Sequence, residues 1–120
     1  MPPFLLVFLG GGLGSVCRWS IGLLLQPLHL RFPWATFVAN GLACLLIGCL
    51  LGWQIAQGLP EQRRLLLSVG FCGGFSTFSS FTVETWQLWQ QGHLFFAAAN
   101  VLGTLTVCLA CLLLGLKISS

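Results

Sequence analysis

The sequence contains very little charge. Charged residues make up 6 % of its 120 residues, and the net charge is +3, whereas a soluble domain carries roughly 25 % charged residues. Five scattered Lys and Arg residues form no basic patch for nucleic acid, and a hydrophobic fraction of 57 % excludes a disordered chain. Too few polar residues are present to cover a water-soluble globule. These shortages leave the lipid bilayer as the solvent of the chain.

Long apolar stretches take the place of the missing charge. A membrane-spanning helix needs about 20 mostly apolar residues, and four stretches meet this requirement. The predicted helices cover about residues 3–25, 34–55, 63–90 and 94–117, and short connectors rich in Pro, Gly and Gln separate them. Strands of a membrane β-barrel alternate apolar and polar residues, whereas these runs are continuous. We therefore predict one all-α, multi-pass membrane domain over residues 1–120 with four transmembrane helices.

The connectors give little information on orientation. Arg63, Arg64 and Lys117 lie on the side of the predicted N-terminus, and Arg31 lies on the other side. The positive-inside rule places the more cationic side in the cytoplasm. An excess of three cations to one is a weak signal, so insertion in both orientations stays open.

Polar and small residues recur at helical spacing inside the predicted spans. Gly10, Gly14 and Arg18 lie four residues apart in the first span. The second and fourth spans repeat this spacing with Asn40, Cys44, Gly48 and Gly52, and with Asn100, Thr104 and Cys108. Small residues let membrane helices pack closely, whereas buried polar groups are costly and mark functional sites. Both interpretations apply to these stripes.

The third span is the most unusual. Gly73-Gly74 followed by Ser76-Thr77 is a poor helix former in the middle of a membrane. We therefore predict a break near residues 73–77. A break exposes backbone carbonyl oxygens, which need protein or a polar cavity around them and are natural ligands for a bare cation.

Two stripes follow the predicted break. Thr77, Ser80 and Glu84 would form a ladder of hydroxyl groups that ends in an acid, and Phe78 and Phe81 would lie beside it. Hydroxyl groups and the positive edges of phenyl rings suit an anion. Together with Arg18 and Asn40, they favour a path for a small anion over a path for a cation.

Residues 70–84, Gly-Phe-Cys-Gly-Gly-Phe-Ser-Thr-Phe-Ser-Ser-Phe-Thr-Val-Glu, resemble the third-span signature of the Fluc (CrcB) fluoride channels. The resemblance extends in order to the Gly-rich segment before Arg18, to Pro33-Trp-Ala-Thr-Phe-Val-Ala-Asn40, and to Asn100-Val-Leu-Gly-Thr. It covers essentially the whole chain. Asn100 stands where some members of the family have a tyrosine, which leaves its pore contact open.

The resemblance implies a fluoride-selective passive channel that exports cytoplasmic fluoride across the cell (inner, or plasma) membrane. It implies an antiparallel, dual-topology homodimer with two pores and a structural sodium ion bound by the backbone carbonyls of Gly73 and Ser76. A hetero-pair of chains is the other assembly found in such proteins. Including Thr77 and Thr104 from the polar stripes, the predicted fluoride pore comprises Arg18, Thr36, Asn40, Thr77, Phe78, Ser79, Ser80, Phe81, Glu84 and Thr104.

Two other functions compete with this prediction, and neither is enzymatic. A small proton-coupled multidrug exporter has the same length and number of spans, but it centres on a glutamate in the first helix. This chain has Arg18 there, and Glu84 comes late in the third span. A membrane assembly factor would use the glycines for packing alone, which leaves the hydroxyl and phenyl stripes unexplained.

Overall fold

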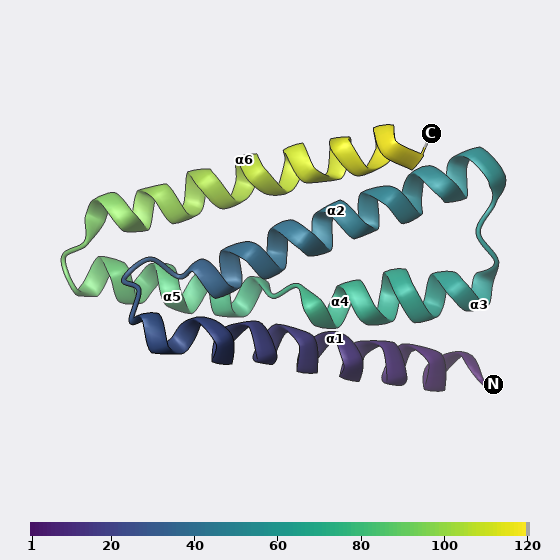
Figure 1. Ribbon diagram of the computed structural model, residues 1–120, viewed down its shortest axis with the longest axis horizontal. Helices are drawn as coiled ribbons and strands as arrows, with labels where there is room; N and C mark the ends of the chain where they lie inside the picture. Colours follow the sequence, from purple (N-terminus) through teal and green to yellow (C-terminus); the bar gives the residue numbers. More distant parts are fainter. Residues whose placement is uncertain (120) are drawn as a thin grey trace.

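The computed structural model describes residues 1–119, and four helical spans run back and forth along one axis (Figure 1). The first, second and fourth spans are the helices α1 (Pro3–Leu25), α2 (Trp34–Gln57) and α6 (Leu94–Ser119). The third span consists of α3 (Glu61–Arg63), the π-helical segment η2 (Arg64–Cys72), α4 (Gly73–Phe75) and α5 (Phe78–Gln90). No strand occurs within residues 1–119.

All four spans are long and apolar enough to cross a membrane. The molecule is 47 Å long, which matches a bilayer of about 40–45 Å including its headgroups. Both termini and the connector between α2 and α3 lie at one end of the molecule, as Figure 1 shows. The chain is therefore a multi-pass membrane protein.

Proline and glycine residues in the connectors mark where the helices begin and end. The helix α2 follows Pro33, and α3 follows Pro60. Gly58 and Gly92 have φ angles of 81° and 82°, which side chains with a Cβ rarely adopt. The second and fourth spans each extend two residues beyond their predicted ends, and the third begins two residues earlier. A short 3₁₀ turn, η1 (Gln26–Leu28), continues the first span.

Glycines bring α1 into backbone contact with the third span. A Cβ atom built on Gly14 would lie 2.7 Å from the backbone nitrogen of Phe75, and one built on Gly10 would lie 2.9 Å from the backbone nitrogen of Phe71. From the other side, Gly74 packs on the backbone of Gly11. The glycine stripe of the first span therefore serves close helix packing, and it places Arg18 one turn further along, beside the predicted break.

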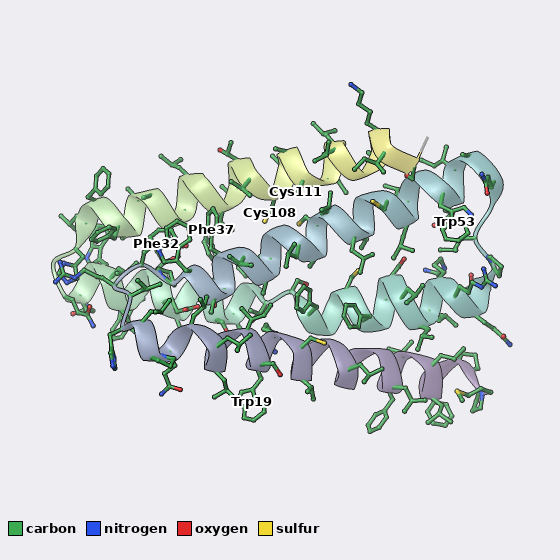
Figure 2. All side chains as sticks on the ribbon, viewed as in Figure 1. Trp19, Phe32, Phe37, Trp53, Cys108 and Cys111 are labelled. Atoms are coloured by element: carbon green, nitrogen blue, oxygen red, sulfur yellow. The ribbon has the colours of Figure 1, made fainter. Side chains whose placement is uncertain are left out.

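The helices α2 and α6 form the second closely packed pair. A Cβ atom built on Gly115 would lie 2.6 Å from the backbone nitrogen of Cys49, and Gly48 packs on the backbone of Leu112. Figure 2 shows Cys108 and Cys111 of α6 on the side that faces α2. All six cysteines are free and lie inside the spans.

The outer surface is that of a membrane protein. Large apolar side chains are widely exposed, including Phe4, Trp19 and Phe95 at 75 %, 64 % and 80 %. Phe32 packs on Phe37 at 5.6 Å between ring centroids at one end of the molecule, and Trp53 lies toward the other end (Figure 2). Aromatic rings at both ends of the spans are typical of the membrane–water interface.

The glycine contacts predict unequal effects of two similar substitutions in α1. Gly14→Ala should destabilise the protein by about 1–3 kcal/mol because the added methyl group overlaps the backbone of the third span. Gly12→Ala is the matched control, since a Cβ atom there meets nothing within 4 Å. Thermal unfolding in detergent micelles measures both. Equal stability of the two variants would contradict the packing described here.

Candidate functional site

The third span is interrupted in the middle of the molecule. Ser76 and Thr77 have extended backbone conformations, with ψ angles of 157° and 116°, between the end of α4 and the start of α5. The break lies at the C-terminal end of the predicted segment 73–77. Figure 1 shows it as a thin segment between two helical stretches.

The side chain of Asn40 in α2 replaces the helical hydrogen bonds of Thr77. Its Oδ1 accepts the backbone N–H of Thr77 at 2.7 Å, and its Nδ2 donates to the backbone carbonyl of Thr77 at 3.1 Å. Asn40 is 8 % exposed. One buried amide therefore satisfies both backbone polar groups of Thr77. Without a partner, these groups would be costly to bury in hydrocarbon.

The break diverts the helical donors of the Gly73 and Ser76 carbonyls to side chains. The backbone N–H of Thr77, which would bond to Gly73 in a continuous helix, donates to Asn40 instead. The backbone N–H of Ser80, which would bond to Ser76, donates to the Thr77 hydroxyl at 3.1 Å, so that Thr77 caps the start of α5. Within residues 1–119, the carbonyl oxygens of Gly73 and Ser76 accept no hydrogen bond from another donor.

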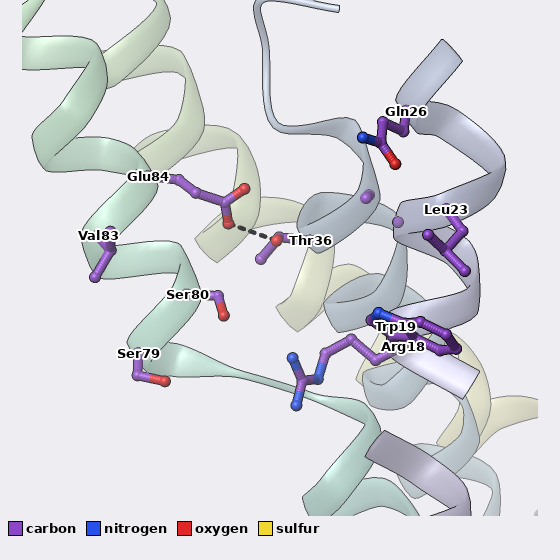
Figure 3. Close-up of a pocket in the computed structure, with 11 residues that line it drawn as sticks. Arg18, Trp19, Leu23, Gln26, Thr36, Ser79, Ser80, Val83 and Glu84 are labelled. Carbon is purple, nitrogen blue, oxygen red and sulfur yellow. Dashed lines mark hydrogen bonds between the residues drawn. The ribbon is translucent and has the colours of Figure 1, made fainter. Parts of the chain in front are cut away.

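A third carbonyl at the break is satisfied from α1. Arg18 donates through Nε to the carbonyl oxygen of Gly74 at 3.2 Å, and the Ser15 hydroxyl donates to the same oxygen at 3.4 Å. The interaction explains how Arg18 is accommodated inside a span. Its terminal nitrogens point across a hollow toward Ser79 (Figure 3).

This hollow, the arginine hollow, has a volume of about 550 Å³. Its polar lining consists of Arg18, Gln26, Thr36, Ser79, Ser80 and Glu84. The Thr36 hydroxyl donates a short hydrogen bond to Glu84 Oε1, which Figure 3 marks with a dashed line. Five of the predicted pore residues thus meet in one polar space between α1, α2 and α5.

The other five predicted pore residues line a second hollow, the phenylalanine hollow, of about 380 Å³. They are Asn40, Thr77, Phe78, Phe81 and Thr104. The rings of Phe78 and Phe81 lie 5.6 Å apart between centroids at an angle of 44°. Phe81 is buried at 8 % exposure, whereas Phe78 is 76 % exposed. Cys44 and Cys108 also line this space, together with Ser76.

The structure corrects the predicted ladder of Thr77, Ser80 and Glu84. Ser80 and Glu84 line the arginine hollow, but Thr77 lies on the phenylalanine hollow. The reason is that Thr77 is extended and caps α5, so it does not belong to the helical register of the two other residues. Ser79 takes its place beside Ser80.

The sequence interpretation missed a buried polar network behind Phe81. Asn100 Nδ2 donates to the Thr85 hydroxyl at 2.8 Å, and the Thr104 hydroxyl donates to Asn100 Oδ1 at 3.2 Å. The helical spacing of Asn100 and Thr104 is visible in the sequence. Their partner Thr85 lies 15 residues before Asn100 on another helix, and no periodicity indicates this pairing.

Protein ligands for a transition metal do not gather in the described part of the chain. Cys108 and Cys111 have the Cys-x-x-Cys spacing, which is also found at metal sites. Within residues 1–119, however, no three His, Cys, Asp or Glu side chains lie close enough to hold a metal ion.

These features define a four-span membrane protein with a broken third helix and two hollows beside the break. The family model described as CrcB-like protein, Camphor Resistance (CrcB), matches residues 5–116. The chain belongs to the CrcB family.

Curated relatives agree with this assignment. A protein of Erythrobacter litoralis is 38 % identical over 129 residues, covering 99 % of this chain and 95 % of the relative. One of Novosphingobium aromaticivorans is 42 % identical over 115 residues, covering 93 % and 91 %. One of Cronobacter sakazakii is 44 % identical over 98 residues, covering 81 % and 77 %. Each is named a fluoride-specific ion channel, which is not an enzyme.

The two-way contact between Asn40 and Thr77 predicts a graded response to substitution. Asn40→Ala leaves the N–H and carbonyl of Thr77 without partners and should destabilise the protein by about 2–4 kcal/mol. Asn40→Asp keeps the acceptor but loses the donor when ionised, so we expect an intermediate loss. Cys44→Ala, one turn away on α2, is the control. Equal stability of Asn40→Ala and Cys44→Ala in micelles would refute the contact.

Proposed function

We propose that the protein is a fluoride-selective passive channel of the cell (inner, or plasma) membrane through which cytoplasmic fluoride leaves the cell. The observation that carries the proposal is the arrangement of ten polar and aromatic residues around the break, in a chain whose relatives are named fluoride-specific ion channels. Fluoride leaks into cells as neutral HF and is trapped inside as the anion, so a passive conductor suffices for its removal.

The chemistry of the two hollows suits a small anion. Hydroxyl groups of Ser79 and Ser80 line the arginine hollow, and hydroxyl groups can donate to an anion. The Thr36 hydroxyl in the same hollow donates to Glu84. In the phenylalanine hollow, Asn40 Nδ2 keeps a second N–H beyond the one given to Thr77. Ring edges of Phe78 and Phe81 add weak positive potential.

Arg18 and Glu84, the charged residues of the arginine hollow, both form hydrogen bonds within the protein. Arg18 Nε is bonded to Gly74, and Glu84 accepts from Thr36. Arg18 can therefore raise the local concentration of an anion, while the uncharged donors further along hold it weakly. Conduction requires binding that is favourable enough to admit the ion and weak enough to release it.

A second copy of the chain completes the channel in this proposal. Phe78 is 76 % exposed beside a break at which the Gly73 and Ser76 carbonyls lack their helical donors, and polar backbone is not left facing lipid. We infer an antiparallel homodimer in which the broken helices meet at the centre and two pores form. The three-to-one distribution of connector cations permits the opposite insertions that this dual topology needs.

The carbonyls of Gly73 and Ser76 suit a structural sodium ion between the two copies. They are the carbonyls whose helical donors are diverted to Asn40 and Thr77. A Cβ atom built on Gly73 would meet nothing within 4 Å, so its backbone is open to an approaching copy. A bound sodium ion would offset the aligned carbonyl dipoles with a positive charge.

A proton-coupled exporter receives less support from the same residues. Coupling requires a carboxyl group that exchanges its proton for substrate at the centre of the membrane. Glu61 stands at the first position of the third span. Glu84 lies two turns from the break toward the end of that span and is hydrogen-bonded to Thr36. Arg18 occupies the first span, where such exporters carry their glutamate.

Fluoride efflux from liposomes tests the proposed function. The reconstituted protein should release fluoride at equal pH on both sides and retain chloride. Phe78→Ile and Phe81→Ile should each lower the fluoride flux at least tenfold because they remove the ring edges from the phenylalanine hollow. Phe95→Ile, on the exposed surface of α6, is the control. Undiminished flux in both pore variants would show that the pore lies elsewhere.

Removal of sodium tests the proposed central ion. Protein prepared without sodium, with depletion verified by flame emission, should lose most of its fluoride flux, and sodium should restore it. The reason is that the unpaired carbonyls of Gly73 and Ser76 would repel each other where the two copies meet. Potassium, which is larger, is the control cation. Full flux in sodium-depleted protein would remove the ion from the proposal.

A further inference from the structure

The most completely buried polar side chain of the described residues lies outside the predicted pore. Asn100 of α6 is 2 % exposed. Its amide is bonded at both ends, donating from Nδ2 to the Thr85 hydroxyl and accepting at Oδ1 from Thr104. Thr85 in turn donates to the backbone carbonyl of Phe81 at 2.8 Å. An unbroken chain of hydrogen bonds thus connects α6 to the backbone of Phe81.

Phe81 occupies a position where a small shift would change the shape of the proposed pore. It lines the phenylalanine hollow on one side and a further hollow of about 420 Å³ on the other, which Thr85 and Val101 also line. Phe81 is therefore part of the wall between two spaces. Its ring contacts the ring of Phe78, which is far more exposed than Phe81.

Thr82 and Thr85 of α5 form the same type of hydrogen bond within the helix, but Thr85 is also bonded to Asn100. Thr82 donates to the carbonyl of Phe78 at 2.9 Å, as Thr85 does to the carbonyl of Phe81. Thr82 is exposed, and within residues 1–119 its hydroxyl has no second partner, whereas the Thr85 hydroxyl is held by Asn100. One phenylalanine of the pair is thus tied to α6, and the other is not.

We propose that Asn100, acting through Thr85, is a positioning residue that fixes Phe81 against α6 and thereby sets the selectivity of the channel for fluoride over larger halides. The inference rests on the proposed function. Asn100 does not contact the anion in this mechanism. It holds the backbone that carries the Phe81 ring, so that the opening between the rings of the pair does not widen to admit chloride.

Removing the network with side chains of similar shape tests the proposal. Thr85→Val deletes the hydroxyl that joins Asn100 to Phe81. The double variant T85V/N100L replaces Asn100 and Thr85 by apolar groups of similar shape, and the Thr104 hydroxyl, which loses its acceptor, can bond to a carbonyl of its own helix. Both variants should lower the fluoride-to-chloride ratio of liposome efflux about fivefold, which corresponds to roughly 1 kcal/mol, because each breaks the link from Asn100 to Phe81. Thr85→Ser should restore the ratio. Thr82→Val is the matched control and should leave it unchanged.

The outcomes separate this inference from the proposed function. If the parent protein releases no fluoride, the proposed function fails. If the parent conducts fluoride while Thr85→Val and T85V/N100L fold, assemble as the parent does and keep its ratio, the positioning role alone is wrong. A double variant that does not fold also overturns it, because the network would then serve stability. A lower ratio in Thr82→Val would contradict it as well.

Discussion

The two-way hydrogen bond between the Asn40 amide and the backbone of Thr77 is the interaction on which the rest of the site depends. A helix that stops inside a bilayer exposes N–H and carbonyl groups that water does not reach. Asn40 satisfies both groups of Thr77, which keeps that residue extended. The Thr77 hydroxyl can then cap α5, and the carbonyls of Gly73 and Ser76 lose their helical donors.

Close packing supports this interaction from α1. The glycines of α1 and of the third span bring the two backbones into contact, so Arg18 and Ser15 reach the carbonyl of Gly74. The carbonyl of Gly74 and both backbone groups of Thr77 therefore have side-chain partners at the break. Little charge is needed for this, because the amide of Asn40 and the hydroxyl groups of Ser15 and Thr77 are neutral and Arg18 is the one charged donor among these contacts.

Much of this organisation could be predicted from the sequence. Continuous apolar runs indicate the four spans. Gly73-Gly74 before Ser76-Thr77 indicates a break within residues 73–77, and the extended residues are Ser76 and Thr77. The partners at the break could not be predicted. Asn40 and Thr77 are 37 residues apart, and Asn100 and Thr85 are 15 apart on different helices. No periodicity encodes such pairs, and the π-helical segment before the break has no signal in composition. Because Thr77 caps α5, it does not belong to the helical stripe with Ser80 and Glu84 that the sequence predicts.

Whether the protein conducts fluoride passively is tested most directly by the current through the purified protein in a planar bilayer. The current is recorded under a fluoride gradient with equal pH on both sides. If the broken helix forms the proposed passive anion path, the current should reverse near the equilibrium potential of fluoride and should change little when chloride is added. Absence of current, or a reversal potential that follows a pH gradient instead of the fluoride gradient, would contradict the account.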